Sequence, residues 1–268
     1  MGLLRTSCGG EVYYEDYGSG DDALILVHGW GMSCRAWDPV LPALAEAHDR
    51  IVLIDHRGCG QSSKDFADMS IGAIAADVAA LVDALAIRRA VLNGWSLGGA
   101  VVVEAAALLG DRCAALILTG GATPVYTQKP DFAHGGTAED MAGTLQAFTT
   151  DKVNFLHGLS QVVCAKPVGA QVEQWFEQIF LQASPLAGAT LGQLAELDQR
   201  ELLLGLDLPV LSVFGSEDGF VAPPICRWVG EHHPKAKAVE FEGVGHAPFI
   251  EEREGYLAAV IPFVQEAL

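Results

Sequence analysis

Short apolar runs alternate with stretches of helical spacing over the first 120 residues. The apolar runs predict strands over residues 1–6, 12–17, 23–27, 51–54, 90–92 and 115–118, and helical spacing predicts helices over 36–47, 74–86 and 97–109. Strands that alternate with helices are typical of a parallel sheet with helices on both faces. The pattern therefore predicts the α/β class.

The alternation stops near residue 122 and resumes near residue 209. Residues 122–187 show helical patterns without a strand, whereas 209–214 and 238–241 predict strands, 223–231 predicts a helix, and the C-terminal helix carries Pro262. We therefore expect an α/β core over 1–121 and 188–268, with a helical lid over 122–187. Aromatic side chains are candidates to line an apolar substrate pocket beneath it: Trp30, Phe132, Phe155, Trp175 and Phe176. We expect at least half of the aromatic side chains of the lid to pack its helices onto each other instead.

Composition and charge exclude several classes of protein. Half of the 268 residues are hydrophobic, which excludes intrinsic disorder, and the net charge of −18 opposes binding to nucleic acid. No apolar run reaches the roughly 18 residues of a membrane span. The six cysteines form no C-x-x-C pair, which indicates reduced thiols. We expect a cytoplasmic protein that binds neither membrane nor nucleic acid.

The strongest chemical signal is the sequence G-W-S-L-G over residues 94–98. It follows the strand at 90–92 and precedes the helix at 97–109, which is the context that a nucleophile elbow requires. Such a turn exposes the serine hydroxyl, and the following helix directs its N-terminus at the site. The pattern predicts Ser96 as a nucleophile.

A serine nucleophile needs a base and a third group that orients the base. Among the downstream histidines, His246 lies in a glycine-rich loop after the last strand. Asp218 follows the strand at 209–214, and the Asp218-Gly219 pair predicts a tight turn that favours it over Glu217. The sequence predicts His246 as the base and Asp218 as the acid.

An oxyanion hole needs two backbone donors. The residue after the nucleophile, Leu97, predicts one donor, and Trp30 in the His-Gly-Trp-Gly loop after the strand at 23–27 predicts the other. We expect His28 to brace this loop and Arg57 to tie loops together by hydrogen bonds. Cys59 has no obvious base and is expected to be a passive thiol.

In this order, the motifs resemble those of the α/β-hydrolase superfamily over nearly the whole chain. They are HGWG (28–31), D-x-R-G-x-G-x-S (55–62), GWSLGG (94–99), G-x-x-DG-x-V (215–221) and GHAPF (245–249). Within the superfamily, the chain looks most like the pimeloyl carrier-protein methyl ester esterases of biotin synthesis. The resemblance implies a serine esterase with nucleophile Ser96, acid Asp218, base His246 and oxyanion donors Trp30 and Leu97.

The implied reaction is hydrolysis of a carboxylic ester through an acyl-enzyme, with no metal or organic cofactor. Lactonase, thioesterase and perhydrolase activities would use the same residues, and a ligand-sensing receptor on this scaffold is an alternative of another class. The resemblance also implies an acyl-carrier protein as partner. However, the region 122–187 has no arginine, and its three lysines and six acidic residues give a net charge of −3, which opposes an acidic carrier.

Overall fold

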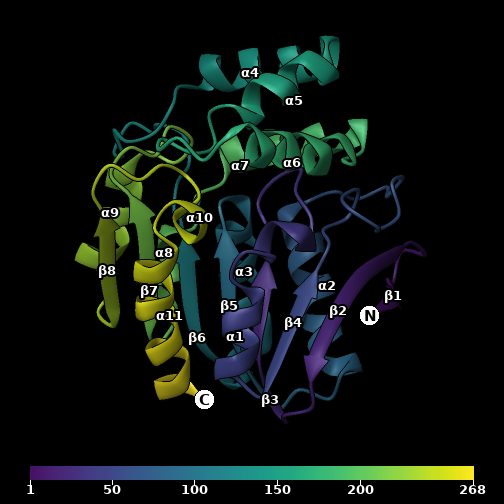
Figure 1. Cartoon of the computed structure of the whole chain (residues 1–268), viewed down its shortest axis with the longest axis vertical. Coiled ribbons are helices and arrows are strands. Elements are labelled where there is room, and N and C mark those ends of the chain that lie inside the picture. Colours follow the sequence, from purple (N-terminus) through teal and green to yellow (C-terminus); the bar gives the residue numbers. More distant parts are fainter.

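All residues from 1 to 268 are described by the computed structural model, in which eight strands form one sheet in the order β1-β2-β4-β3-β5-β6-β7-β8 (Figure 1). The strands are β1 (Gly2–Arg5), β2 (Glu11–Gly18), β3 (Asp22–Val27), β4 (Arg50–Ile54), β5 (Arg89–Trp95), β6 (Cys113–Thr119), β7 (Val210–Gly215) and β8 (Ala236–Phe241). The β1–β2 and β2–β4 pairs are antiparallel and the others are parallel. This mostly parallel sheet confirms the predicted fold class.

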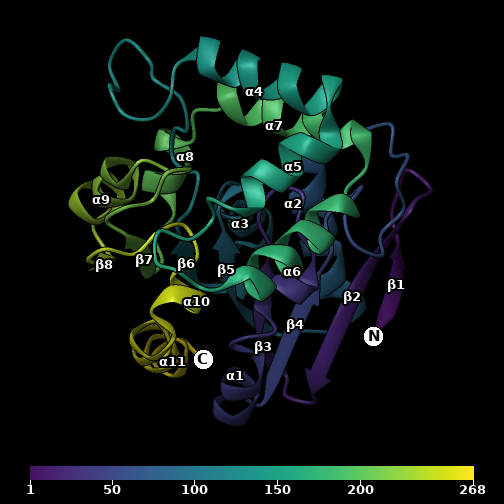
Figure 2. The same cartoon turned by 45° about the horizontal axis from the view of Figure 1, so that its top comes forward.

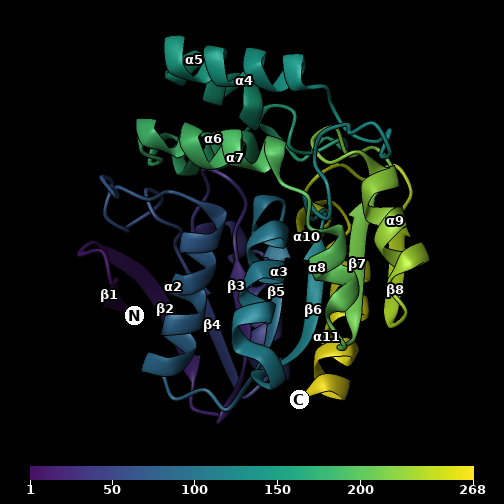
Figure 3. The same cartoon turned by 180° about the vertical axis from the view of Figure 1, so that it is seen from behind.

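Helices cover both faces of the sheet. The helices α1 (Leu41–Ala47) and α11 (Arg253–Ala267) pack on one face, and α2 (Ile71–Ala84), α3 (Leu97–Leu109) and α9 (Pro223–His232) pack on the other (Figures 1 and 3). The short helix α10 (Pro248–Glu251) precedes α11, and the 3₁₀ turn η2 (Gly110–Arg112) follows α3. The central strands are therefore buried on both sides, which explains their continuous apolar runs.

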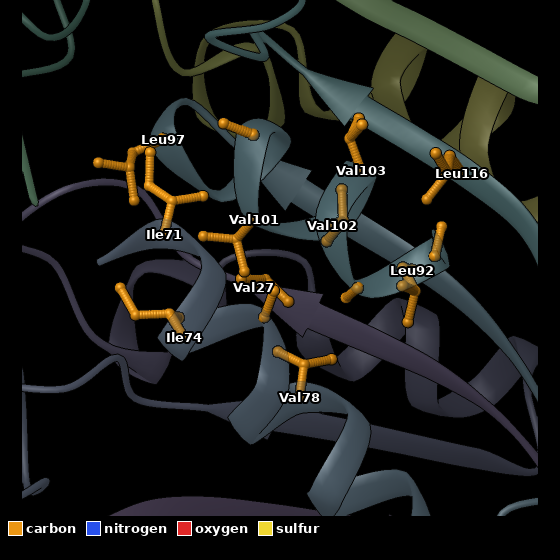
Figure 4. Close-up of a cluster of buried hydrophobic side chains, with 14 of the residues drawn as sticks. Val27, Ile71, Ile74, Val78, Leu92, Leu97, Val101, Val102, Val103 and Leu116 are labelled. Atoms are coloured by element: carbon orange, nitrogen blue, oxygen red, sulfur yellow. The ribbon is translucent and has the colours of Figure 1, made fainter. Parts of the chain in front are cut away.

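The core beside α2 and α3 is built almost entirely from aliphatic side chains. Figure 4 shows residues of α2 and α3, among them Ile74, Val78 and Val101, directed toward Val27 of β3 and Leu92 of β5. Each of these five residues has at most 1% of its surface exposed. Burial of one such side chain contributes about 1.5–3 kcal/mol, so this layer fixes the two helices on the sheet.

The helical insertion lies between β6 and β7, above the carboxyl ends of the parallel strands (Figure 2). It contains α4 (Ala138–Thr150), α5 (Lys152–Ser160), α6 (Ala170–Leu181), the 3₁₀ turn η3 (Pro185–Ala187), α7 (Gly188–Glu196) and α8 (Arg200–Gly205). Of these, α8 packs against α3 on the face of the sheet. The predicted lid ended at 187, but α7 packs against α4 and shares the apolar layer above the strands. The helical segment between β6 and β7 thus extends beyond the predicted boundary.

The helix predicted over 36–47 is wrong as one element. The structure has a 3₁₀ turn, η1 (Cys34–Trp37), followed by the separate helix α1. Pro39 has no N–H with which to continue a helix, and Pro42 occupies the first turn of α1, where a missing donor is tolerated. In contrast, α11 continues through Pro262.

None of these helices combines the length and the apolar character that crossing a bilayer demands.

A buried ion pair joins the loop after β4 to α2. Arg57 Nη2 lies 2.8 Å from Asp77 Oδ1, and Arg57 Nη1 donates to the Asp68 carbonyl at 2.9 Å. Both side chains of the pair are at most 5% exposed. Arg57 therefore ties loops together, as the sequence predicts, through charge-assisted hydrogen bonds.

Removal of one partner from this pair should be costly. Asp77→Ala leaves a buried guanidinium without its carboxylate, and we expect the free energy of unfolding to fall by about 3–5 kcal/mol. Asp83, also on α2, pairs with Arg112 but is 66% exposed, so Asp83→Ala should cost less than about 1 kcal/mol. Urea unfolding of both variants measures the difference, and equal losses would contradict the assignment.

Candidate active site

Ser96 lies on a strained turn between β5 and α3. Its backbone has φ 56° and ψ −122°, a conformation that residues other than glycine rarely adopt. The Ser96 carbonyl accepts hydrogen bonds from the N–H groups of Gly99 and Ala122, both at 2.8 Å. A Cβ atom on Gly98 would lie 2.4 Å from the Val27 carbonyl oxygen, so only glycine lets α3 approach β3 this closely. The surrounding backbone thus holds the turn in place.

His246 and Asp218 are brought together from loops after β8 and β7. Their Nδ1 and Oδ2 atoms are 2.8 Å apart. The other carboxylate oxygen of Asp218 accepts from the N–H groups of Phe220 and Val221 at 2.8 and 2.9 Å. Glu217, the alternative acid, is exposed. Both oxygens of Asp218 are therefore engaged, and its orientation toward His246 is fixed.

Four residues that sequence reasoning missed position the His246 ring and loop. The Phe220 ring stacks on the imidazole at 4.8 Å, and Trp95 Nε1 donates to the His246 carbonyl at 2.8 Å. Gly120 has φ 48°, and a Cβ atom there would lie 3.2 Å from Asp218 Oδ2. Trp95 lies inside the G-x-S-x-G motif, and this position is the one sequence signal that could have identified any of the four. The roles of the other three become visible only in the folded structure.

Glu251, the fourth of them, connects the His246 loop to the helical insertion. Its carboxylate accepts hydrogen bonds from the N–H groups of Gly245 and Ala247, in the loop, and of Ala165 and Lys166, between α5 and α6. The His246 N–H also donates to the Val163 carbonyl at 3.0 Å. The loop that carries the imidazole is thus fixed from both the core and the insertion.

An apolar cavity of about 70 Å³ opens above Ser96. A single water needs roughly 10–15 Å³ measured in this way, so the cavity has room for several ligand atoms. Of its 17 lining residues 13 are hydrophobic and none carries a formal charge. They are Gly29, Trp30, Met32, Trp95, Ser96, Leu97, Tyr126, Met141, Thr144, Phe155, Leu159, Val163, Phe180, Leu191, Leu194, Phe220 and His246. The cavity therefore joins Ser96 and His246 to the insertion.

The predicted pocket residues divide into two groups. Trp30 and Phe155 line the cavity, whereas Phe132, Trp175 and Phe176 do not. Phe132 packs against Trp228 and beneath the Arg200 guanidinium, and Trp175 packs on Phe176, whose ring faces that of Trp95. These three aromatic side chains pack between structural elements and do not line the cavity, so their prediction as pocket residues is wrong.

The predicted oxyanion donors flank Ser96. The Trp30 N–H makes no backbone hydrogen bond, and the Leu97 N–H, at the first position of α3, has no partner within its helix. The indole of Trp30 donates to the Ala187 carbonyl at 2.8 Å, which ties this loop to the insertion. Both N–H groups remain available for a ligand.

Two stacked histidines lie behind this loop. His28 and His56 have ring centroids 3.9 Å apart, and His28 bonds the Gly29 carbonyl and the His56 N–H. His28 thus braces the loop as predicted. Burial lowers the pKa of both imidazoles, and His56 Nε2 has no hydrogen-bond partner. Burial also raises the pKa of the Cys59 thiol to about 12, which makes it a passive thiol.

Comparisons with known proteins agree with this architecture. Residues 22–253 match the family model described as the alpha/beta hydrolase fold. A pimeloyl-[acyl-carrier protein] methyl ester esterase of Klebsiella pneumoniae is 31% identical, over 90% of this chain and 92% of that protein. An AB hydrolase superfamily protein of Bacillus subtilis is 27% identical, over 94% of each chain.

An esterase of Exiguobacterium antarcticum has a similar solved structure, with a TM-score of 0.94, 24% identity and 98% coverage of both chains. Together the matches confirm the predicted fold and family resemblance, and they support the prediction of a hydrolase that acts on ester bonds.

The histidine pair predicts how stability depends on pH. The folded pKa values lie below the ordinary value of 6.5, so as the pH falls below 6.5 the unfolded chain binds protons that the folded chain refuses. We expect the free energy of unfolding to fall by about 1–3 kcal/mol between about pH 7.5 and 5.5. His56→Phe keeps a stacked ring without a titrating group and should weaken this dependence.

Urea unfolding across this pH range measures the effect. Replacement of the exposed His232 by Gln is the control and should leave the pH dependence unchanged. The same dependence in His56→Phe and in the wild type would contradict the assignment.

Proposed function

We propose that this chain, which belongs to the α/β-hydrolase family, hydrolyses carboxylic esters with Ser96, His246 and Asp218 as a catalytic triad. The observation that carries the proposal is the 2.8 Å contact between Asp218 Oδ2 and His246 Nδ1, at a cavity that His246 shares with Ser96. With Asp218 accepting at Nδ1, the Nε2 atom of a neutral imidazole is left as the proton acceptor.

In the first half of the reaction, Ser96 Oγ attacks the ester carbonyl carbon while His246 Nε2 takes the hydroxyl proton. The Trp30 and Leu97 N–H groups, which have no partner in the protein, donate to the developing oxyanion. This attack forms a first tetrahedral intermediate. Its collapse breaks the bond to the alcohol oxygen, and His246 gives its proton to the leaving alcohol. Ser96 is left acylated.

In the second half, His246 takes a proton from water, which attacks the acyl carbon. The attack by water forms a second tetrahedral intermediate. Its collapse breaks the bond to Ser96 Oγ, and His246 returns the proton to the serine. The carboxylic acid leaves. Asp218 stabilises the imidazolium in both halves, and its own hydrogen bonds to Phe220 and Val221 keep it oriented.

The cavity lining favours a small ester with an uncharged, apolar acyl group. No lining residue carries a formal charge, so a free carboxylate on the acyl chain would lose its hydration without gaining a partner. Each buried CH₂ group contributes roughly 0.8 kcal/mol. Hydrolysis of lactones or thioesters, and perhydrolysis, would use the same triad. A protein that only binds an ester would not hydrolyse it.

A carrier-linked methyl ester is a second candidate, which the Klebsiella pneumoniae relative favours. The lysines of the insertion argue against it. Lys129 donates to the Ala195 and Glu196 carbonyls, Lys152 to those of Leu181 and Ala183, and Lys166 pairs with Glu252. Only Lys166 is paired with an acidic side chain, but the region 122–187 as a whole carries a net charge of −3, which opposes an acidic carrier.

The triad predicts the effect of removing the nucleophile. Ser96→Ala should lower kcat for a p-nitrophenyl ester by about 10⁴- to 10⁶-fold, because the reaction loses its covalent route. Unchanged urea unfolding should show that the fold persists. Replacement of the exposed Ser19 by Ala is the control and should retain full activity. Retention of more than a few per cent of activity by Ser96→Ala would exclude the assignment.

Salt dependence separates the two substrate classes. The net charge of −18 should repel an acidic carrier protein, so kcat/KM for a carrier-linked methyl ester should rise with ionic strength. The value for a neutral small ester should barely change, and it should be the larger of the two at low salt. A steep fall with salt for the carrier-linked substrate would reveal attractive steering and favour the second candidate.

A further inference from the structure

A cleft whose lining is more polar than that of the catalytic cavity adjoins this cavity between the start of α4 and the loop after β7. Its lining includes Tyr126, Thr137, Asp140, Met141, Thr144 and Phe220. Four of them, Tyr126, Met141, Thr144 and Phe220, also line the cavity above Ser96. The cleft and the cavity therefore share a wall.

The shared wall lies on the side of the base. Phe220 stacks on the His246 ring at 4.8 Å, and Asp218 bonds the same imidazole. In the proposed reaction, His246 must hand a proton to the leaving alcohol, so the alcohol has to lie beside this ring. The cleft, as the more polar of the two spaces, is thus placed to receive the alcohol, whereas the apolar remainder of the cavity suits the acyl chain.

The hydroxyl of Tyr126 stands out in this wall because nothing in the protein bonds it. It makes no side-chain hydrogen bond, yet it is not among the fully enclosed polar atoms without a partner. Burial raises the pKa of this phenol to about 12, so it is a neutral donor at ordinary pH. The protein thus leaves without a partner a hydroxyl that is not fully enclosed, on a half-buried residue that lines both the cavity and the cleft, and this hydroxyl is open to a ligand.

The neighbouring hydroxyls are already engaged. Thr144 Oγ1 donates to the Asp140 carbonyl at 2.9 Å, and Thr137 Oγ1 pairs with the Asp140 carboxylate at 2.7 Å in the capping box of α4. Among the side chains shared by cleft and cavity, Tyr126 alone offers a hydroxyl proton that the protein does not use.

We propose that Tyr126 and the adjoining cleft form a binding subsite for the alcohol moiety of the ester, which selects alcohols that carry a further hydrogen-bonding oxygen. The Tyr126 hydroxyl donates to that oxygen. Glycol-type and glycerol-type esters have the required chemistry, whereas simple alkyl esters leave the hydroxyl without a partner. Tyr126 is here a specificity residue, and the inference rests on the proposed function.

A matched pair of esters tests the subsite. Hydroxyethyl butanoate and propyl butanoate have the same number of heavy atoms and differ in one terminal oxygen. The ratio of their kcat/KM values should be roughly 2- to 10-fold higher in the wild type than in Tyr126→Phe, as expected for one hydrogen bond. The intrinsic reactivity of the two alcohols cancels in this comparison. The change should appear in KM for the hydroxyethyl ester, with kcat unaltered.

Tyr14→Phe is the matched control, because the Tyr14 hydroxyl on β2 also bonds nothing in the protein and the residue does not line the cavity. It should leave the ratio unchanged. Tyr126→Leu is a second variant in case the first retains the preference through a water, and thermal unfolding should show that both variants are folded.

The outcomes separate the subsite from the triad. If both esters are hydrolysed and their ratio is the same in the wild type and in both Tyr126 variants, the subsite is wrong and the proposed function stands. If the variants lose activity equally on both esters, Tyr126 has a structural role and the subsite is again wrong. If the wild type hydrolyses neither ester, the proposed function fails, and the subsite with it.

Discussion

The close packing of α3 against β3 and β5 is the constraint on which the candidate active site depends. Gly98 approaches the Val27 carbonyl too closely for any side chain, and the turn before it forces Ser96 into φ 56°. A conformation of this kind costs on the order of 1–3 kcal/mol and persists only when the surroundings over-determine it. The aliphatic layer beneath α3 and the hydrogen bonds of the Ser96 carbonyl together hold Ser96 in this conformation.

The helical insertion takes part in the same architecture and is more than a cover. It contacts the core through the Trp30 indole, which bonds the Ala187 carbonyl, and through Glu251, which binds N–H groups on both sides. These contacts reach the loop of the proposed oxyanion donor and the loop of the proposed base. A movement of the insertion would therefore displace both loops, so lid position and catalytic geometry are coupled through named hydrogen bonds.

The negative charge of the protein lies outside the cavity above Ser96. The acidic surface gives a net charge of −18, while the cavity above Ser96 has no charged lining residue. Coulombic effects therefore act on the approach of a partner, and apolar contact acts on the ligand after entry. The Tyr126 hydroxyl adds a neutral polar group at the boundary between cavity and cleft, where it can discriminate between alcohols without drawing in a charged ligand.

The sequence by itself determined the α/β class, most strands, and the order of Ser96, Asp218 and His246, because these features depend on local patterns. A buried strand appears in the sequence as a short apolar run. The turn at Ser96 needs its glycines within five positions. Pro39 and Pro42 carried a local signal for the break between η1 and α1, which helical spacing obscured. Only the tertiary structure decided which aromatic side chains face the cavity. Phe132, in the loop before α4, packs under Arg200, whereas Phe155, on α5, lines the cavity, because contacts with residues far away in the chain set the environment of each ring. The role of Glu251 came from contacts between segments far apart in the chain, and that proposed for Tyr126 rests on the cavity and the cleft that such segments enclose. No local pattern encodes either.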